Sequence, residues 1–364
     1  MSDDRDDAPT LSPRAAMERY LRRRGADATE QSIEGWYYRL KLFVEWCESV
    51  GIETVDEITG LDLDEYYELR SSEVAPATLE GEMWTLTMYF RYLEQLQVVD
   101  QALSESVRIP DLDEEDRTDN TQLVDDAALA LLEYYRNDDA AYGTRDHVYL
   151  ELAWTIGARK GGLRALDVRD VHPEDGYIEF VHRPETDTPL KRKAAGQRPA
   201  ALMEGTSAVL QHYLRHHRHD VHDDHGRQPF LASTQGRPAV TTITSWSYQA
   251  TLPCLHGPCP HGKEPETCEW TEFAHASKCP SSRSPHQVRT GSITWQLNLG
   301  IPPEVVAERV NADLDTIEDH YDKATEEEKR KRRRKRMERD RRPFIEDVDL
   351  DDLDDTDTAI DDQN

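Results

Sequence analysis

The sequence predicts a chain of two domains and tails, mainly α-helical with a small β-sheet (α+β). Its 364 residues exceed the usual length of one domain, so two domains are expected. Apolar residues in the first third recur at the three- and four-residue spacing of amphipathic helices. Further along, residues 177–182 roughly alternate apolar and polar side chains before a turn-rich stretch, which is typical of a strand. Helices are therefore expected to dominate.

The first predicted domain, residues 10–109, follows an acidic start, residues 1–9, that is expected to be disordered. Two sets of apolar residues each mark one face of a helix: Leu40, Phe43, Val44 and Cys47, then Leu86, Tyr89, Phe90 and Leu93. Thr59 and Thr78 are predicted helix starts, because a hydroxyl can cap the first turn. A bundle of four or five helices is expected, with Cys47 as a small apolar filler of its core.

The second predicted domain spans residues 125–342. A linker is expected at residues 110–124, because PDLDEEDRTDN has a single Leu among charged and turn-forming residues. Helices are predicted over residues 127–135 and 147–157, ahead of the strand. The acidic, low-complexity tail, residues 343–364, is expected to be disordered.

The charge of the chain is strongly acidic but unevenly distributed. The formal net charge is −29, which by itself argues against a nucleic-acid partner. Basic residues are nevertheless concentrated at residues 191–193 and 329–342. Only 10 of the 44 basic residues are Lys, against 73 acidic residues, a composition that resembles halophilic archaeal proteins working in molar salt. In such salt, binding to phosphates by charge alone is weakened.

A membrane partner is not expected. No stretch approaches the roughly 20 apolar residues that a membrane span requires, and the first thirty residues contain no apolar run. The sequence therefore predicts a soluble, cytoplasmic protein.

Three segments of the second domain carry residue types suited to phosphoryl transfer: TIGARKGGLRALDVRDV (155–171), SPHQVRTGSITWQLNLG (284–300) and RVNADLDTIEDHYDKAT (309–325). Here the chain resembles the tyrosine recombinase (phage integrase) family. The family's boxes read T-G-x-R-x-x-E-L-x-x-L, H-x-x-R and L-G-H, with the nucleophilic tyrosine nine residues after the last. The resemblance spans most of the chain. It implies a helical, SAM-like core-binding domain followed by a catalytic domain that breaks and rejoins DNA.

The chemistry explains why these residue types are needed. An attacked phosphodiester becomes highly charged, and two guanidinium forks can each bind its oxygens; Arg159 and Arg289 are the candidates. His286 lies three residues before Arg289, so a helix places both on one face. The resemblance implies that Tyr321 is the nucleophile and forms a 3′-phosphotyrosyl bond. A tyrosine hydroxyl has a pKa near 10, so it must either lose its proton to a base, for which His286 is the candidate, or be stabilised as phenolate by the arginines.

A lysine is expected to protonate the leaving 5′ oxygen, since the family carries one on a β-hairpin. The stretch TPLKRKAAGQRPAAL, residues 188–202, resembles that hairpin. Lys193 stands five residues before Arg198, as the family pattern would place it, and Lys191 is the alternative.

Two positions depart from the family pattern. Gly162 stands where the first box has an acid, and Ala312 where the family has His or Trp nine residues before the tyrosine. A lost phosphate donor of this kind can be worth about 3 kcal/mol. Either a neighbour such as Asn311 substitutes or turnover is slower. The alternative function is therefore a catalytically weakened DNA-binding protein of the same fold.

A cysteine-rich insertion, residues 252–280, predicts a metal site. Its preferred ligands are Cys254, Cys259, Cys268 and Cys279, with His261 or His275 as substitutes. Structural zinc is favoured over free thiols and over disulfides, which need an oxidising compartment. No C-x-x-C pairing is present. A zinc hydrolase would need a carboxylate ligand and an open metal position, which this cluster does not offer.

The last basic run, residues 326–342, begins with acids and continues with bases, so i,i+4 pairs can form on a helix. A solvated charged helix, an arm contacting phosphates and a helix exchanged between protomers all fit this pattern. The resemblance implies double-stranded DNA and a homo-oligomer, a tetramer on DNA, as partners. It implies no nucleotide cofactor, and any zinc would be structural.

Overall fold

The structure, a computed structural model, describes residues 11–113, 121–320 and 334. It divides into two compact units, Met1–Asn120 and Thr121–Asn364, each described here by itself. Within the described residues the chain is mainly helical and carries one small antiparallel sheet, so the predicted fold class is confirmed.

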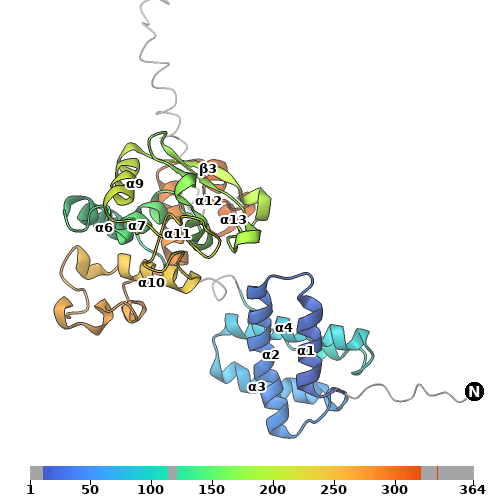
Figure 1. Cartoon of the computed structure of the whole chain (residues 1–364). Coiled ribbons are helices and arrows are strands. Elements are labelled where there is room, and N and C mark those ends of the chain that lie inside the picture. The colour runs from blue at the N-terminus through green and yellow to red at the C-terminus, as the bar shows by residue number, and fades with distance from the viewer. Residues whose placement is uncertain (1–10, 114–120, 321–333, 335–364) are drawn as a thin grey trace, which may run out of the picture. The chain divides into compact units, whose positions relative to one another are not determined.

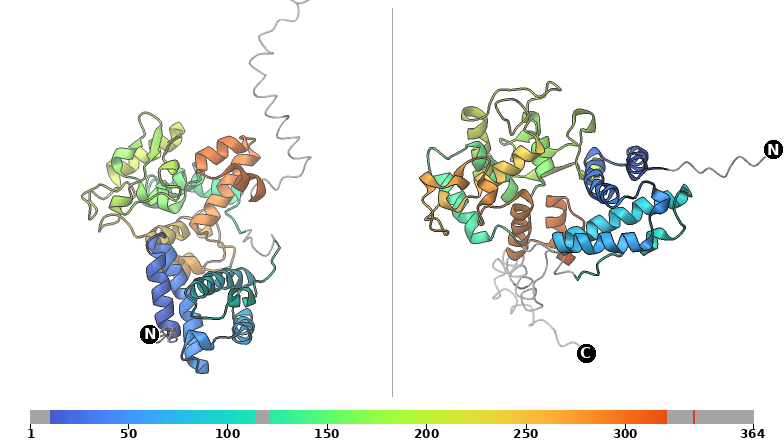
Figure 2. Two further views of the ribbon diagram at one scale, coloured as in Figure 1. Left: turned by 90° about the vertical axis from the view of Figure 1, so that its right-hand side faces the viewer. Right: turned by 90° about the horizontal axis from the view of Figure 1, so that it is seen from below.

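Helices α1 to α4 build the first unit: α1 (Pro13–Arg24), α2 (Glu30–Val50), α3 (Gly60–Glu73) and α4 (Pro76–Gln95). α1 packs against α2, and α4 contacts α1, α2 and α3, as can be followed in Figures 1 and 2. Both predicted apolar faces lie in the core of this unit, and Cys47 is fully buried there as an apolar filler.

The starts of α3 and α4 show how local residues set helix ends. Thr59 caps α3 as predicted: its hydroxyl accepts from the Asp62 N–H, and the Asp62 carboxylate accepts from the Thr59 N–H. Thr78 does not start α4, which begins two residues earlier at Pro76. Proline is well suited to the first helical position because its fixed φ matches the helix and it has no N–H to leave unbonded.

The second unit contains most of the remaining elements. Its helices are α6 (Asp125–Asn137), α7 (Arg145–Thr155), α8 (Lys160–Ala165), α9 (Glu204–His216), α10 (Val240–Ala250), α11 (Pro285–Asn298), α12 (Pro303–Val310) and α13 (Leu314–His320). Its strands are β1 (Val171–His172), β2 (Tyr177–Phe180) and β3 (Arg198–Ala201). α7 is buried on nearly all sides and contacts α6, α9, α10 and α11, so it forms the centre of this unit (Figure 1).

The sheet is a short antiparallel meander in the order β1-β2-β3. Phe180 pairs with Arg198 and Tyr177 with Ala201, so residues 181–197 form the loop of a β2–β3 hairpin. The predicted strand continued to His182, but β2 ends at Phe180. His182 turns to loop contacts, because its ring Nδ1 accepts from the Leu190 N–H at 2.9 Å and its N–H donates to Gln197.

α11 is packed unusually close to the chain that enters this unit. The Leu123 N–H donates to the carbonyl of Gln287 at 3.1 Å. A Cβ at Gly291 would lie 1.9 Å from the Leu123 carbonyl oxygen. Glycine at position 291 therefore lets the Leu123 backbone run against α11 and helps to position that helix.

None of the helices among the described residues is both long and apolar enough to cross a membrane.

Candidate active site

Three consecutive backbone carbonyls at the end of α12 each accept a hydrogen bond from a different arginine. The Arg309 carbonyl accepts from Arg198 Nε at 2.9 Å, and the Val310 carbonyl from Arg289 Nη1 at 2.7 Å. The Asn311 carbonyl accepts from Arg159 Nη1. The last carbonyls of a helix lack helical partners and form the negative end of its dipole, so cations are favoured there. We call residues 309–311 the carbonyl turn.

Arg159 reaches this turn from the N-terminus of α8, where it is the N-cap residue. The chain arrives there through Gly157, whose φ of +70° favours glycine. A Cβ at Gly157 would also lie 2.9 Å from Val310 Cγ1 and 3.0 Å from Ser292 Oγ. The glycine therefore allows the segment before Arg159 to approach the carbonyl turn closely.

Arg289 reaches the turn from α11 and is only 5% exposed. Its Nη1 donates to the carbonyls of Gly157 and Val310, so it joins the α8 and α12 segments. A capping box between Ser284 and Gln287 fixes the start of α11. His286 lies exposed in the first turn of the same helix, three residues before Arg289.

The two hairpin lysines lie exposed on the β2–β3 loop. Lys193 has a left-handed φ of +52°, and its N–H donates to the Leu190 carbonyl at 2.9 Å. Between them, Arg192 forms an ion pair with Asp313 at 2.8 Å, just beyond the carbonyl turn. The β2–β3 loop of residues 181–197, here called the lysine loop, is therefore docked beside the turn that holds Arg159.

Arg198, at the start of β3, has a charge that is poorly solvated. Its guanidinium lies over the Phe180 ring at 4.3 Å. Burial, and then the charges of Arg159 and Arg309, lower the pKa of Arg198 to about 10. Burial also lowers the pKa of Arg309. Positive charges thus gather at one place in a chain whose net charge is −29.

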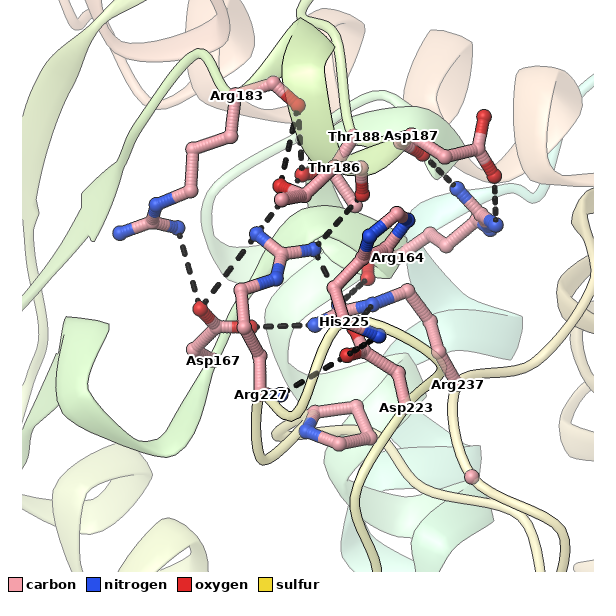
Figure 3. Close-up of polar contacts among 12 residues, drawn as sticks. Arg164, Asp167, Arg183, Thr186, Asp187, Thr188, Asp223, His225, Arg227 and Arg237 are labelled. Carbon is pink, nitrogen blue, oxygen red and sulfur yellow. Dashed lines mark hydrogen bonds and ion pairs between the residues drawn. The ribbon is translucent and has the colours of Figure 1, made fainter.

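The base of the lysine loop is held by buried ion pairs, and Figure 3 draws those that Arg183 and Arg227 make with Asp167. Arg183 donates to both carboxylate oxygens of Asp170, at 2.8 and 2.6 Å. Arg227 donates to Thr188 Oγ1 at 3.1 Å and to the Thr186 carbonyl at 3.2 Å. These contacts fix both sides of the first loop turn, residues 183–188.

A second layer of the same network links segments far apart in the sequence (Figure 3). Arg237 donates to the carboxylates of Asp167 and Asp223, and Arg227 lies within ion-pair distance of both. Burial would raise the pKa of Asp223, but the Arg227 N–H and the Arg237 guanidinium lower it to about 2. In a single sequence such charges are indistinguishable from surface residues, so only their burial reveals them.

The structure gives the two family departures local surroundings. A Cβ at Gly162 would lie 3.3 Å from two atoms of the Phe180 ring, the ring over which Arg198 stacks. A larger residue at position 162 would therefore press on this ring. Ala312 is 8% exposed and packs in a small apolar cluster with Ile293, Leu297, Val306, Ala307, Val310 and Ile317.

Tyr321, the predicted nucleophile, lies outside the described residues, directly after the last residue of α13. The basic run of residues 326–342 also lies outside them, except for Arg334. The structure describes the chain that leads to Tyr321. The carbonyl turn is followed by Ala312, Asp313 and then α13, whose Ile317 N–H donates to the Asp313 carbonyl.

The cysteine insertion contains only 3-10 turns between α10 and α11. Cys254 and Cys279 both belong to a small apolar cluster with Trp270. Burial raises the pKa of the Cys254 thiol, and the thiols of Cys259, Cys279 and Cys268 raise it further.

These cysteines do not form a metal-binding arrangement as they stand. No group of three or more His, Cys, Asp or Glu side chains in the described part of the chain is placed to hold a metal ion. The predicted zinc is thus not supported by the described geometry. The two substitute ligands have other partners: His261 hydrogen-bonds Ser281 at 3.0 Å, and His275 lies 3.6 Å from Glu272.

The chain, a helical unit followed by a mainly helical unit with a three-stranded meander, is similar in fold to solved integrases. An integrase of the transposon Tn1549, solved with circular intermediate DNA, matches 90% of this chain and 99% of its own, with a TM-score of 0.64 and 14% identity. A lambda integrase dimer bound to a COC′ core site matches 86% of this chain and 78% of its own, with a TM-score of 0.60 and 13% identity.

A third structure matches a smaller part of this chain. It is the N-terminal domain of a phage integrase/site-specific recombinase from Haloarcula marismortui, 50% identical over 28% of this chain and 99% of its own, with a TM-score of 0.28. No protein-family model and no curated protein matches the sequence. The chain resembles the tyrosine recombinase (phage integrase) family over most of its length and has the fold of that family, as its motifs predicted.

Proposed function

We propose that the chain is a site-specific DNA recombinase, or integrase, that cuts and rejoins DNA through a 3′-phosphotyrosyl intermediate. The observation that carries this proposal is the convergence of Arg159 and Arg289 on adjacent carbonyls of the turn that precedes α13 and Tyr321. Two guanidinium groups so close together suit a phosphate whose charge grows in the transition state.

The proposed step transfers a phosphoryl group without hydrolysing a nucleotide. The Tyr321 hydroxyl loses its proton to His286, its oxygen bonds to phosphorus, and the bond from phosphorus to the 5′ oxygen breaks. The 5′ oxygen takes a proton from Lys193, or from Lys191, and leaves as a hydroxyl. Attack by a 5′ hydroxyl of a partner duplex then reverses these events and releases the tyrosine.

The proposed partners are double-stranded DNA and further copies of the chain, forming a tetramer on DNA. The similar Tn1549 and lambda integrases were solved bound to DNA, the latter as a dimer. Rejoining a strand to a different duplex needs at least two active protomers, and the same fold in DNA-bound relatives supports this assembly.

A covalent adduct tests the proposal. Nicked suicide duplexes drawn from the DNA that flanks the gene are incubated with the protein and separated on a denaturing gel. We expect a protein–DNA adduct with the wild type and with the control Tyr177→Phe, whose tyrosine lies on β2. Tyr321→Phe should give none. An adduct with Tyr321→Phe, or no adduct with the wild type, overturns the assignment.

The alternative proposal is a DNA-binding protein that kept the fold and lost turnover. Gly162 and Ala312, which stand where the family has functional side chains, favour it. In the same experiment this protein would retard the duplex on a native gel and leave no adduct on the denaturing gel.

We also propose that the four cysteines of the insertion bind structural zinc. Their thiols would then lie closer together than in the structure. The shared cluster of Cys254 and Cys279 with Trp270 supports this, as does the absence of α-helix and sheet from residues 252–280 of the described chain. Such a loop buries too little apolar surface to be well ordered by itself. Zinc would hold the loop together and take no part in the transfer.

Metal content decides the zinc proposal. Protein purified without added metal should carry about one zinc per chain, as expected for a four-ligand site. Cys268→Ser should lower this content, whereas Cys47→Ala, in the core of the other unit, should not. Zinc near zero in the wild type overturns the proposal.

A last proposal concerns the salt concentration in which the protein works. The excess of acidic over basic residues, 73 against 44, and the scarcity of Lys support function in concentrated salt. Screening of self-repulsion should then raise the thermal midpoint as KCl increases from low to molar concentration. A midpoint that is independent of KCl, or that falls, contradicts it.

A further inference from the structure

We propose that Arg198 is a positioning residue for DNA cleavage, which ties the loop carrying Lys191 and Lys193 to the turn that holds Arg159 and Arg289. This inference rests on the proposed function. Arg198 lies outside the three motif segments 155–171, 284–300 and 309–325, yet it shares the carbonyl turn with both predicted phosphate-binding arginines.

The guanidinium of Arg198 joins two segments that are distant in the sequence. Its Nε donates to the Arg309 carbonyl at 2.9 Å, and its Nη1 donates to the Gly196 carbonyl at 3.3 Å. One carbonyl belongs to the carbonyl turn, and the other to the end of the lysine loop. A planar fork with several fixed donors can make both bonds together, whereas a lysine ammonium is a single point on a flexible stem.

The loop depends on such contacts because the strand ladder stops short of it. β2 and β3 pair only from Tyr177 to Phe180, so the loop between Phe180 and Arg198 must be held by other means. Close to the turn, these are the Arg198 fork, the Arg192–Asp313 ion pair and the tight approach of Gly196 to Asn311. A Cβ at Gly196 would lie 3.0 Å from Asn311 Nδ2.

Of these three contacts, the pair of hydrogen bonds made by Arg198 is the least exposed to solvent. Arg192 and Asp313 have side chains 37% and 67% exposed, so water and salt weaken their ion pair. Arg198 is instead half-buried against the Phe180 ring. Its loss should therefore loosen the lysine loop while leaving Arg159 and Arg289 on their own carbonyls.

This reasoning predicts a specific kind of defect, a failure to protonate the leaving group. A substrate with sulfur in place of the bridging 5′ oxygen separates this defect from others. A thiolate leaves without a proton, because a thiol is far more acidic than an alcohol. The sulfur substrate thus removes the need for the lysine but not the need for the two arginines or Tyr321.

The experiment compares adduct formation by Arg198→Lys and Arg198→Ala on all-oxygen and on 5′-bridging phosphorothiolate suicide duplexes. On the oxygen substrate we expect both variants to cleave at least about tenfold more slowly than the wild type, in the range of a lost general acid. On the sulfur substrate their rates should return to within about threefold of the wild type, because the chemistry no longer uses the lysine. Native gels should show unchanged DNA binding.

Arg218→Ala is the matched control. Its guanidinium also donates hydrogen bonds to two loop carbonyls, those of Pro229 at 3.0 Å and Val221 at 3.3 Å. These carbonyls lie in the segment between α9 and α10, away from the carbonyl turn. It should cleave both substrates at the wild-type rate, and thermal unfolding of each variant shows that the fold is kept.

Two outcomes overturn the inference while leaving the proposed function intact. In the first, Arg198→Lys and Arg198→Ala cleave the oxygen substrate at the wild-type rate. The other is a slow rate that sulfur does not restore, which would place Arg198 with the phosphate-binding arginines. The absence of any adduct from the wild type would instead defeat the proposed function itself.

Discussion

Arg159 and Arg289 are bound by two adjacent backbone carbonyls, those of Asn311 and Val310. One arginine comes from the N-cap of α8 and the other from the middle of α11. Because both are held by one turn at the end of α12, the fold itself sets their separation. Such preorganisation is what stabilises a charged transition state without a further ordering cost.

Replacing either arginine by lysine should slow cleavage much more than it weakens DNA binding. The variants Arg159→Lys and Arg289→Lys keep a positive charge but lose the fork that binds two phosphate oxygens, so we expect about a hundredfold slower adduct formation. The rate is measured on the suicide duplex, and the affinity by native gel. Equal losses in rate and affinity would contradict a role confined to the transition state.

Gly291→Ala should strongly destabilise the second unit. A Cβ at this position would lie 1.9 Å from the Leu123 carbonyl oxygen, so the backbone of α11 or of Leu123 must move. We expect a loss of about 3 kcal/mol or more in the free energy of unfolding, measured in urea.

Gly205→Ala is the control for that variant. Position 205 lies in α9, and a Cβ there meets nothing within 4 Å. Alanine in an unobstructed helix should leave stability unchanged or raise it by up to about 1 kcal/mol. Similar losses for Gly291→Ala and Gly205→Ala would refute the packing argument.

The stability of the second unit should fall in acid between about pH 4 and pH 2. The pKa of Asp223 is lowered to about 2 in the folded chain, so its contribution is complete above its unfolded pKa near 4 and is lost as the pH falls towards 2. Asp223→Asn should flatten this dependence by about 1–2 kcal/mol in urea unfolding. Asp220→Asn, whose side chain is 86% exposed, should leave the dependence as it is. If Asp223→Asn has the same pH dependence of the free energy of unfolding as the wild type, the buried ion pairs of Asp223 do not stabilise the fold in this way.

Introducing the family's histidine at position 312 should not raise activity. Ala312 is packed among apolar side chains, so Ala312→His must enlarge a filled site or expel the ring, at a cost of about 1–3 kcal/mol. We expect a lower thermal midpoint and no gain in adduct formation. Faster cleavage by this variant would show that the alanine limits turnover.

Much of the fold could be predicted from the residues alone. The apolar spacing around Phe43 and Phe90 predicted two core helices, and both residues are fully buried. The capping chemistry of Thr59 and Asp62 predicted the start of α3. Helix spacing and caps depend on neighbours within one or two turns, so they can be read locally. The motif order likewise predicted the family fold.

Other features could not be read in this way. Thr78 has the chemistry of a cap, but Pro76 starts the helix. Asp167 and Asp223 look like two acids among many, and only the folded chain buries them against Arg227 and Arg237. The zinc predicted from the cysteine pattern stays a proposal, because the described side chains form no group of three or more possible ligands.

By itself the sequence determined the helical class, the order of the motifs and which arginines to consider. Only the tertiary structure decided that Arg159, Arg198 and Arg289 share three consecutive carbonyls. The physical reason is that a helix end offers its last carbonyls to whatever donors the fold brings there. Those donors come from α8, β3 and α11, and contacts between such distant segments are set by packing and leave no periodic trace in the sequence.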